Sequence, residues 1–204
     1  MLSASPIPPP TETIISADEL RKNIDNKDFI IFDSRCDIKD QGYGIDSYTE
    51  GHIPNSIFVD IDNDLASEKQ PGTGRHPLPN VDMFCEKLSH WGMSNNKQVV
   101  IYDDAGGAFA GRMWWMMKWL GHDLVAVLDG GVNSWVKEGN KLVTSPTIFE
   151  KSYFEPNVRN DMIAQVSDVE EAQFKMNTIL LDESGLKKGL TETIEWFKKP
   201  KNLE

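Results

Sequence analysis

The sequence predicts an α/β fold with a largely parallel sheet that is covered by helices on both faces. Two apolar runs, at 28–32 and 98–102, have the length and composition of buried strands. Between 98 and 139, strand-like and helix-like segments alternate with short connections. This alternation is typical of parallel strands joined by crossover helices, which bury both faces of the sheet.

The first third of the chain contains a leader, a capped helix and two strands. The prolines of residues 3–11 predict a flexible leader over residues 1–11. Ser16 and Glu19 have the spacing of a capping box, so we expect a short helix to start there. The next elements are a strand, a polar glycine-containing loop and a short strand, at 28–32, 33–48 and 57–59.

The middle of the chain carries the alternating pattern. A loop rich in proline and glycine at 71–79 precedes a helix at 80–91, which Gly92 ends. A nearly all-apolar segment at 112–120 predicts a buried helix. The other elements of this region are two strands and a helix, at 98–102, 124–128 and 132–138.

The last quarter of the chain begins a second copy of the first pattern. Residues 141–160 show no strong periodicity, and we expect a linker at 143–160. Ser167 and Glu170 form a second predicted capping box. The remaining elements are a strand at 178–182 and a helix at 185–199. A capped helix followed by a strand ending in Asp thus occurs twice, so 161–204 is predicted to be the remnant of a second domain.

The composition limits the classes of function. The net charge of −11 argues against nucleic-acid binding and against anionic membrane surfaces. No apolar run approaches the roughly 18 residues of a membrane span, and residues 1–10 lack the features of a secretory signal. Two cysteines, Cys36 and Cys85, are too few for a disulfide scaffold. We therefore expect a reduced protein of the cytoplasm.

The loop after the strand at 98–102 is the best candidate binding site. It consists of Asp103, Asp104, Ala105, Gly106, Gly107, Ala108 and Phe109. Ligands of open α/β sheets bind at the carboxyl ends of the strands, where backbone N–H groups near a helix N-terminus can hold an anion. The two acidic residues would oppose such an anion at the mouth of the loop. A tight turn that simply requires small residues is the alternative interpretation.

The thiols and imidazoles give no clear catalytic pattern. Neither cysteine lies in the loop, where a thiol would be activated. Cys85 is interpreted as a core residue, and Cys36 as a bystander that Arg35 could partly activate. The four histidines lack the spacing of metal ligands, so no metal and no cofactor are predicted. His52, in a structured turn, is predicted to be a scaffold residue. Asp33 and Arg35 favour a structural ion pair or a loop anchor.

Several of these segments resemble the rhodanese family. Residues 32–35 and 51–56 are similar to its paired signatures, and residues 127–131 are similar to its late strand. The segments at 75–79 and 112–116 resemble the N-terminal domain of tandem sulfurtransferases, which act on thiosulfate or 3-mercaptopyruvate. The resemblance implies a rhodanese-like domain at 12–142, with a parallel five-stranded sheet and helices on both faces.

The same resemblance implies a silent domain. In tandem sulfurtransferases the second domain carries a persulfide cysteine, and Asp103 stands at the corresponding position here. A carboxylate has no sulfur to carry, and its charge would repel thiosulfate. The resemblance assigns Asp33, Arg35, His52 and Arg75 to structural or interdomain roles. The resemblance also implies that the second domain is truncated before its catalytic loop. The tail from 185 to 197 resembles the last helix of nucleotide-sugar epimerases, as a gene fusion would produce, and an ordinary amphipathic helix is the alternative interpretation.

Three functions remain open at this point. The first is a sulfurtransferase homologue without activity, and the second is a binding or scaffolding module that uses the Asp103 loop or the former interdomain face. The third is residual sulfur transfer through Cys36. The expected partners are a weakly bound sulfur-containing small anion, a second copy of the chain, or a separate catalytic rhodanese domain. A homodimer would cover the apolar face near Arg75 and His76.

Overall fold

The computed structural model describes residues 13–172. The chain divides into two compact units, with the boundary between Arg159 and Asn160. The first unit contains the sheet, and the second contains a 3-10 turn at Asn160–Met162 and helix α6 at Val166–Ala172. The predicted leader, the strand at 178–182 and the tail helix at 185–199 lie outside the described residues.

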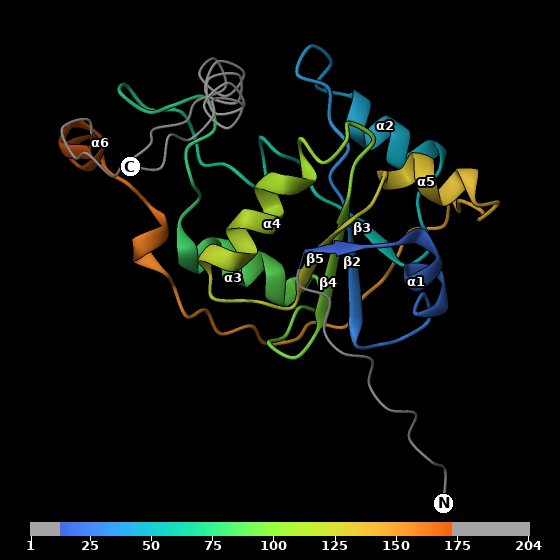
Figure 1. The fold of residues 1–204 in the computed structure, drawn as a ribbon. Coiled ribbons are helices and arrows are strands. Elements are labelled where there is room, and N and C mark those ends of the chain that lie inside the picture. The colour runs from blue at the N-terminus through green and yellow to red at the C-terminus, as the bar shows by residue number, and fades with distance from the viewer. Residues whose placement is uncertain (1–12, 173–204) are drawn as a thin grey trace, which may run out of the picture. The chain divides into compact units, whose positions relative to one another are not determined.

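Five parallel strands form the sheet of the first unit, in the order β1-β5-β4-β2-β3 (Figure 1). The strands are β1 (Ile14–Ile15), β2 (Phe29–Asp33), β3 (Ser56–Phe58), β4 (Gln98–Tyr102) and β5 (Val125–Leu128). The register places Ile31 opposite Val100 and Val100 opposite Ala126, so these side chains share one face of the sheet. The predicted fold class is confirmed.

Helices cover both faces of this sheet. They are α1 (Ala17–Lys22), α2 (Tyr43–Glu50), α3 (Val81–His90), α4 (Ala110–Trp119) and α5 (Gly131–Lys137). Figure 1 shows α3 and α4 on one face, and α1 and α5 on the other. On the latter face, Leu20 of α1 and Trp135 of α5 belong to the same buried cluster as Ile31 and Val100. The helices α1 and α5 therefore bury their apolar sides against this face of the sheet.

Local capping signals set the starts of two helices where the sequence predicts them. Ser16 Oγ accepts a hydrogen bond from the N–H of Glu19 at 3.1 Å, and Asn80 Oδ1 accepts one from the N–H of Met83 at 3.1 Å. The second predicted capping box is wrong. Helix α6 begins at Val166, before Ser167, and the Asp168 carboxylate accepts the N–H of Gln165 at 2.7 Å. The acidic side chain at the third helical position thus accepts the N–H of the residue before the helix, which is the geometry of the acidic member of a capping box.

Two elements of the first unit differ from the prediction. The predicted loop at 33–48 contains most of α2, because the glycines that suggested a loop serve close packing instead. A Cβ at Gly44 would lie 2.3 Å from the carbonyl oxygen of Arg35. Strand β1 was not predicted from the residues, since two residues are too short for a periodic signal.

Residues 143–159 belong to the first unit, although they contain no helix or strand. The N–H of Ser152 donates to the carbonyl oxygen of Ser89 at 2.8 Å, and the N–H of Asn157 donates to that of Leu120 at 2.8 Å. Phe154, between them, is 3% exposed. This segment is therefore fixed along the ends of α3 and α4 by backbone hydrogen bonds.

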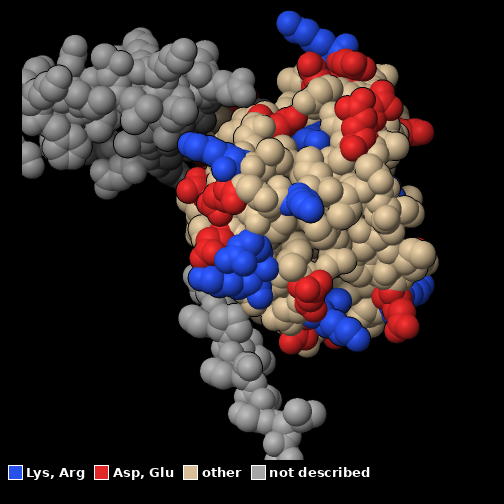
Figure 2. Space-filling view, turned by 90° about the vertical axis from the view of Figure 1, so that its right-hand side faces the viewer, with Lys and Arg blue, Asp and Glu red and all other residues tan. Residues whose placement is uncertain are grey.

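The surface carries many acidic side chains. Figure 2 shows the side of the first unit that carries α1 and α5, with a broad uncharged area below a group of Asp and Glu side chains. Ile45 of α2 and Val136 of α5 are 45% and 49% exposed. Among residues 13–172, no helix is long and apolar enough to cross a membrane.

His122 is a buried histidine just after α4. Its Nε2 lies 3.0 Å from the carbonyl oxygen of Lys97 and 3.1 Å from that of Leu124. Because both partners are acceptors, Nε2 carries a hydrogen and donates. Burial lowers the pKa of His122 from its ordinary value of 6.5, and the two carbonyl oxygens offset this only in part.

We expect His122 to make the protein less stable in mild acid. The pKa of His122 is lower in the folded protein than in the unfolded chain. The contribution of neutral His122 to the free energy of unfolding is therefore fully present above pH 6.5 and is lost as the pH falls toward the folded pKa. One titrating group can change the free energy of unfolding by at most about 1.4 kcal/mol per pH unit. Urea unfolding between about pH 8 and pH 5 should give a shallower decline for His122→Gln than for the wild type. The exposed-site variant His90→Gln is the control, and equal slopes for all three proteins would contradict the assignment.

Candidate functional site

The Asp103 loop forms a cradle of backbone N–H groups between β4 and α4. Gly106 and Gly107 have φ angles of +69° and +88°, which L side chains rarely adopt, and these angles turn the chain back toward the end of β4. Four N–H groups point at one place. They belong to Ala105, Gly107, Phe109 and Ala110. The loop therefore has the anion-binding geometry that the sequence suggests.

The carboxylate of Asp103 itself occupies this cradle. Its Oδ1 accepts from Ala105 and Gly107 at 3.0 and 2.9 Å, and its Oδ2 accepts from Phe109 and Ala110 at 2.9 Å each. The residue is 1% exposed. The cradle is thus filled by an anion that is part of the chain, with both oxygens fully used.

The expectation that both aspartates stand at the mouth of the loop is wrong for Asp103. Only Asp104 points away from the cradle, and it accepts a hydrogen bond from the hydroxyl of Tyr43 on α2. The sequence shows how many N–H groups the loop has, but it does not show the direction of the side chain at position 103. Four unpaired donors attract the nearest carboxylate, which is one residue beyond the strand.

The backbone of Asp103 is also fixed. Its carbonyl oxygen accepts the N–H of Val132, at the start of α5, at 3.0 Å. The preceding residue, Gly131, has a φ of +58°, and a Cβ there would lie 2.0 Å from the Asp103 oxygen. Gly131 is therefore required for the close approach of α5 to the cradle.

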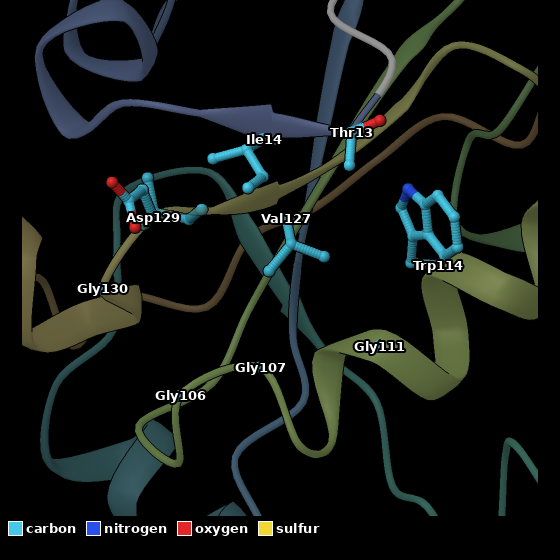
Figure 3. Close-up of a pocket in the computed structure, with 10 residues that line it drawn as sticks. Thr13, Ile14, Gly106, Gly107, Gly111, Trp114, Val127, Asp129 and Gly130 are labelled. Atoms are coloured by element: carbon cyan, nitrogen blue, oxygen red, sulfur yellow. The ribbon is translucent and has the colours of Figure 1, made fainter. Parts of the chain in front are cut away.

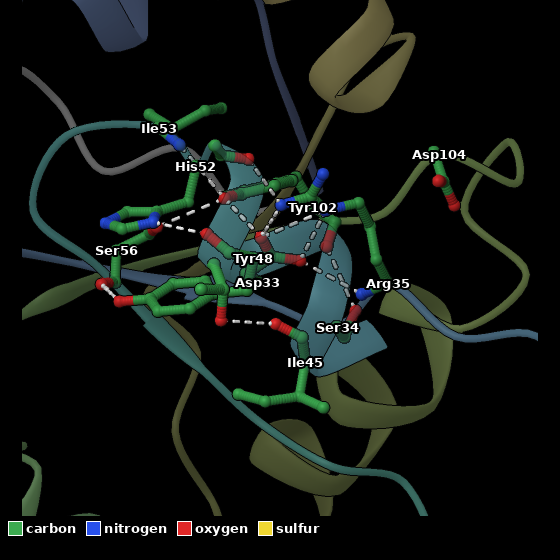
Figure 4. A network of polar contacts seen from close by, with 12 residues as sticks. Asp33, Ser34, Arg35, Ile45, Tyr48, His52, Ile53, Ser56, Tyr102 and Asp104 are labelled. Atoms are coloured by element: carbon green, nitrogen blue, oxygen red, sulfur yellow. Dashed lines mark hydrogen bonds and ion pairs between the residues drawn. The ribbon is translucent and has the colours of Figure 1, made fainter. Parts of the chain in front are cut away.

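A buried polar network supports the strand end beneath the cradle (Figure 4). Arg35 and Asp33 form an ion pair at 2.6 Å, and the Asp33 Oδ2 atom also accepts the hydroxyl of Tyr102 at 2.6 Å. The guanidinium of Arg35 also donates a hydrogen bond to the carbonyl oxygen of Gly51 at 2.8 Å. Burial, and then the Asp33 charge, raise the pKa of Tyr102 well above its usual value, so the hydroxyl stays protonated and donates.

His52 lies in the backbone scaffold of the same region. Its Nδ1 and Nε2 lie 2.7 and 3.1 Å from the carbonyl oxygens of Tyr48 and Ser145, and its ring stacks on that of Tyr48 at 3.8 Å. The side chain is 1% exposed. These contacts tie the turn at 51–54 to α2 and to the segment that follows β5 and α5.

Arg75 and Cys36 lie outside the cradle. Arg75 is exposed, and the neighbouring His76 places Nε2 3.0 Å from Asp62 Oδ1. Burial raises the pKa of the Cys36 thiol, and the nearby aspartates, Asp62 first, raise it further against the smaller effect of Arg75. Burial raises the pKa of Cys85 to about 11. Neither thiol has the electropositive surroundings of a reactive cysteine.

Three residues that shape this site were not singled out from the sequence. Tyr102 resembles an ordinary strand residue, yet its hydroxyl connects Asp33 to the turn at 51–54 through the N–H of Ile53, at 3.1 Å. Tyr43 and Gly131 were also missed. The signal that could have found Tyr102 is its position, since it directly precedes the candidate loop at the end of a buried strand. Among residues 13–172, no cluster of His, Cys, Asp and Glu could hold a metal ion.

The parallel sheet and the cradle at its carboxyl end define a protein of the rhodanese class. Residues 16–138 match the family model of the rhodanese-like domain. The chain therefore belongs to the rhodanese family, as the sequence motifs led us to expect, and it is a homologue of the sulfurtransferases of that family.

The relatives are sulfurtransferases longer than this chain. A probable 3-mercaptopyruvate sulfurtransferase of Pseudomonas aeruginosa is 34% identical over 171 residues, which cover 83% of this chain and 60% of the relative. The thiosulfate sulfurtransferase of Bos taurus is 34% identical over 128 residues, or 61% of this chain and 41% of the relative. The structure of SseA from Escherichia coli, a 3-mercaptopyruvate sulfotransferase with the rhodanese fold, matches with a TM-score of 0.73 and 26% identity, covering 81% of this chain and 63% of SseA. The chain thus spans less than two thirds of each.

Proposed function

We propose that this chain is a catalytically silent homologue of the thiosulfate and 3-mercaptopyruvate sulfurtransferases, which acts as the first half of a tandem arrangement. The single observation that carries the proposal is the Asp103 carboxylate, which accepts all four N–H groups of the cradle. A cradle filled in this way has no place for a second anion.

The chemistry of sulfur transfer explains why this matters. A thiolate must attack the outer sulfur of thiosulfate, release sulfite and hold the sulfur as a persulfide until an acceptor such as cyanide takes it. A carboxylate forms no such bond. The outer sulfur of a persulfide lies two bonds beyond Cβ, as the carboxylate oxygens of aspartate do, so Asp103 mimics the charge and reach of the intermediate without its reactivity. The chain's two thiols have raised pKa values and lie elsewhere.

The partner that fits this arrangement is a second rhodanese domain with its own persulfide cysteine. The relatives extend well beyond the length that this chain covers, which is consistent with a tandem enzyme whose first rhodanese domain corresponds to this chain. The resemblance of the tail at 185–197 to the last helix of nucleotide-sugar epimerases is part of the same proposal, as the product of a gene fusion. The tail lies outside the described residues.

An assay with cyanide as the sulfur acceptor tests the proposal. We expect no thiocyanate above background from either thiosulfate or 3-mercaptopyruvate. In Asp103→Cys, the thiol sits where four N–H groups converge, which stabilises the thiolate. Its pKa, followed by thiolate absorbance in a Cys36→Ser background, should therefore be lower than that of an ordinary thiol.

The matched control is Asp104→Cys, whose thiol lies outside the cradle and should show no lowering of its pKa. Wild-type turnover that is abolished by Cys36→Ser would overturn the proposal and assign sulfur transfer to Cys36. A thiol pKa at position 103 that is no lower than at position 104 would show that the cradle does not stabilise an anion.

A further inference from the structure

An apolar groove lies beside the Asp103 loop, outside the cradle. It has a volume of about 480 Å³, and its floor and walls come from the glycines of the loop, the first turn of α4, and strands β1 and β5. In Figure 3, Val127 stands above Gly107 in the middle of the groove, with Trp114 on one side and Asp129 on the other. Asp129 is the only charged residue that lines it among the described residues.

The shape of the groove suits an extended, uncharged peptide. Gly106, Gly107 and Gly111 present no side chains, so a peptide backbone can approach the floor closely. Trp114 provides an aromatic wall, and proline-rich peptides characteristically bind to grooves lined by aromatic rings. Ile14, on the rim and at the edge of the sheet, is 60% exposed.

We propose that this groove is the docking site of the chain's own amino-terminal segment, residues 3–11. The segment contains Pro6, Pro8, Pro9 and Pro10, and it has no charged side chain, whereas charged residues make up 26% of the whole chain. Its composition therefore matches the groove and differs from the rest of the surface. Proline-rich segments favour the polyproline II conformation, so docking costs them little conformational entropy.

The position of the segment supports the same occupant. One residue, Glu12, separates it from Thr13, where the described part of the chain begins, and Thr13 itself lines the groove. In the polyproline II conformation, nine residues span about 28 Å, enough to reach the lining residues. The covalent connection gives the segment a high effective concentration at the groove, so even weak contacts are occupied. Its prolines would also shield the open edge of β1 from pairing with other chains.

A substitution at Gly111 tests the proposal in the full chain. A Cβ at Gly111 meets no atom within 4 Å, so Gly111→Leu fills the groove without a clash. We expect the NMR order parameter of the Ile7 amide to be about 0.8 in the wild type, as in folded backbone, and below about 0.6 in Gly111→Leu. Gly74→Leu, at another open glycine far along the chain, is the control and should leave Ile7 unchanged.

A second variant changes the segment and leaves the groove intact. Replacing Pro8, Pro9 and Pro10 by aspartate should shift the indole N–H signal of Trp114 and lower the Ile7 order parameter as Gly111→Leu does. An Ile7 amide that is already mobile in the wild type, or that is indifferent to Gly111→Leu, overturns the proposal. Groove signals that depend on protein concentration over a tenfold range would also overturn it, because they would indicate a second copy of the chain as the occupant.

Discussion

Asp103→Ala is expected to lower the free energy of unfolding by about 3 kcal/mol at neutral pH. Four backbone N–H groups lose their acceptor together. Hydrogen bonds to a charged group contribute about 1.5–3 kcal/mol each, but water can reach the exposed Ala105 and the half-buried Gly107 and Phe109 and replace part of the loss. The measurement is urea or thermal unfolding of the variant beside the wild type.

Asp104→Ala is the matched control for this substitution. It removes a carboxylate from the next position in the same loop, and the hydrogen bond that Asp104 accepts from Tyr43 is lost. We expect a change of less than about 1 kcal/mol, which is typical of a partly exposed hydrogen bond. Equal effects of the two substitutions would contradict the special role of Asp103 and would attribute the loss to the general charge of the loop.

Asp103→Ala should also gain an anion site. With the internal carboxylate removed, a sulfate ion can accept the same N–H groups, and at ten times its dissociation constant it would restore about 1.4 kcal/mol. Sulfate stabilises most proteins to some degree, so the relevant quantity is the excess over the wild type, whose cradle stays filled. No excess stabilisation of Asp103→Ala over the wild type and Asp104→Ala would refute the anion-cradle interpretation.

The elements that follow local rules could be predicted from the sequence. Strand β4 occupies 98–102 as predicted, and the helix starts after Ser16 and Asn80 follow capping geometry that involves only three or four neighbouring residues. Helix α2 could not be predicted in this way. Gly44 lowers the helical propensity, and its reason for being there, contact with the backbone of Arg35, depends on tertiary packing.

The candidate site shows the same division. The composition of the Asp103 loop indicates an anion cradle, because small residues between a strand and a helix leave N–H groups free to converge. The occupant of the cradle depends on one side-chain torsion, which no spacing reveals. Likewise, the spacing of Asp33 and Arg35 suggests an ion pair, but the third member, Tyr102, comes from a strand 69 positions away in sequence and is brought in only by the register of β2 and β4.

Asp33→Asn should destabilise the chain by about 3–5 kcal/mol, because the substitution keeps the shape of the side chain but leaves the guanidinium of Arg35 without a counter-charge. Arg35 is 7% exposed and Asp33 is fully buried, so water cannot compensate. The exposed counterpart of this buried ion pair is Asp18, which pairs with Arg21 and Lys22. These three side chains are half exposed or more. Asp18→Asn is expected to change stability little, since exposed ion pairs contribute little.

A double substitution separates the cost of an unpaired charge from the general loss of packing. In Asp33→Asn/Arg35→Met the unpaired guanidinium is removed, so the double variant should be more stable than Asp33→Asn alone. The carbonyl oxygen of Gly51 loses its hydrogen-bond donor in the double variant, which reduces this gain. Denaturant unfolding of the wild type, the two single variants and the double variant completes the thermodynamic cycle. Additive losses in the double variant would show that Asp33 and Arg35 act independently, which would remove the ion pair as the support of the strand end beneath the cradle.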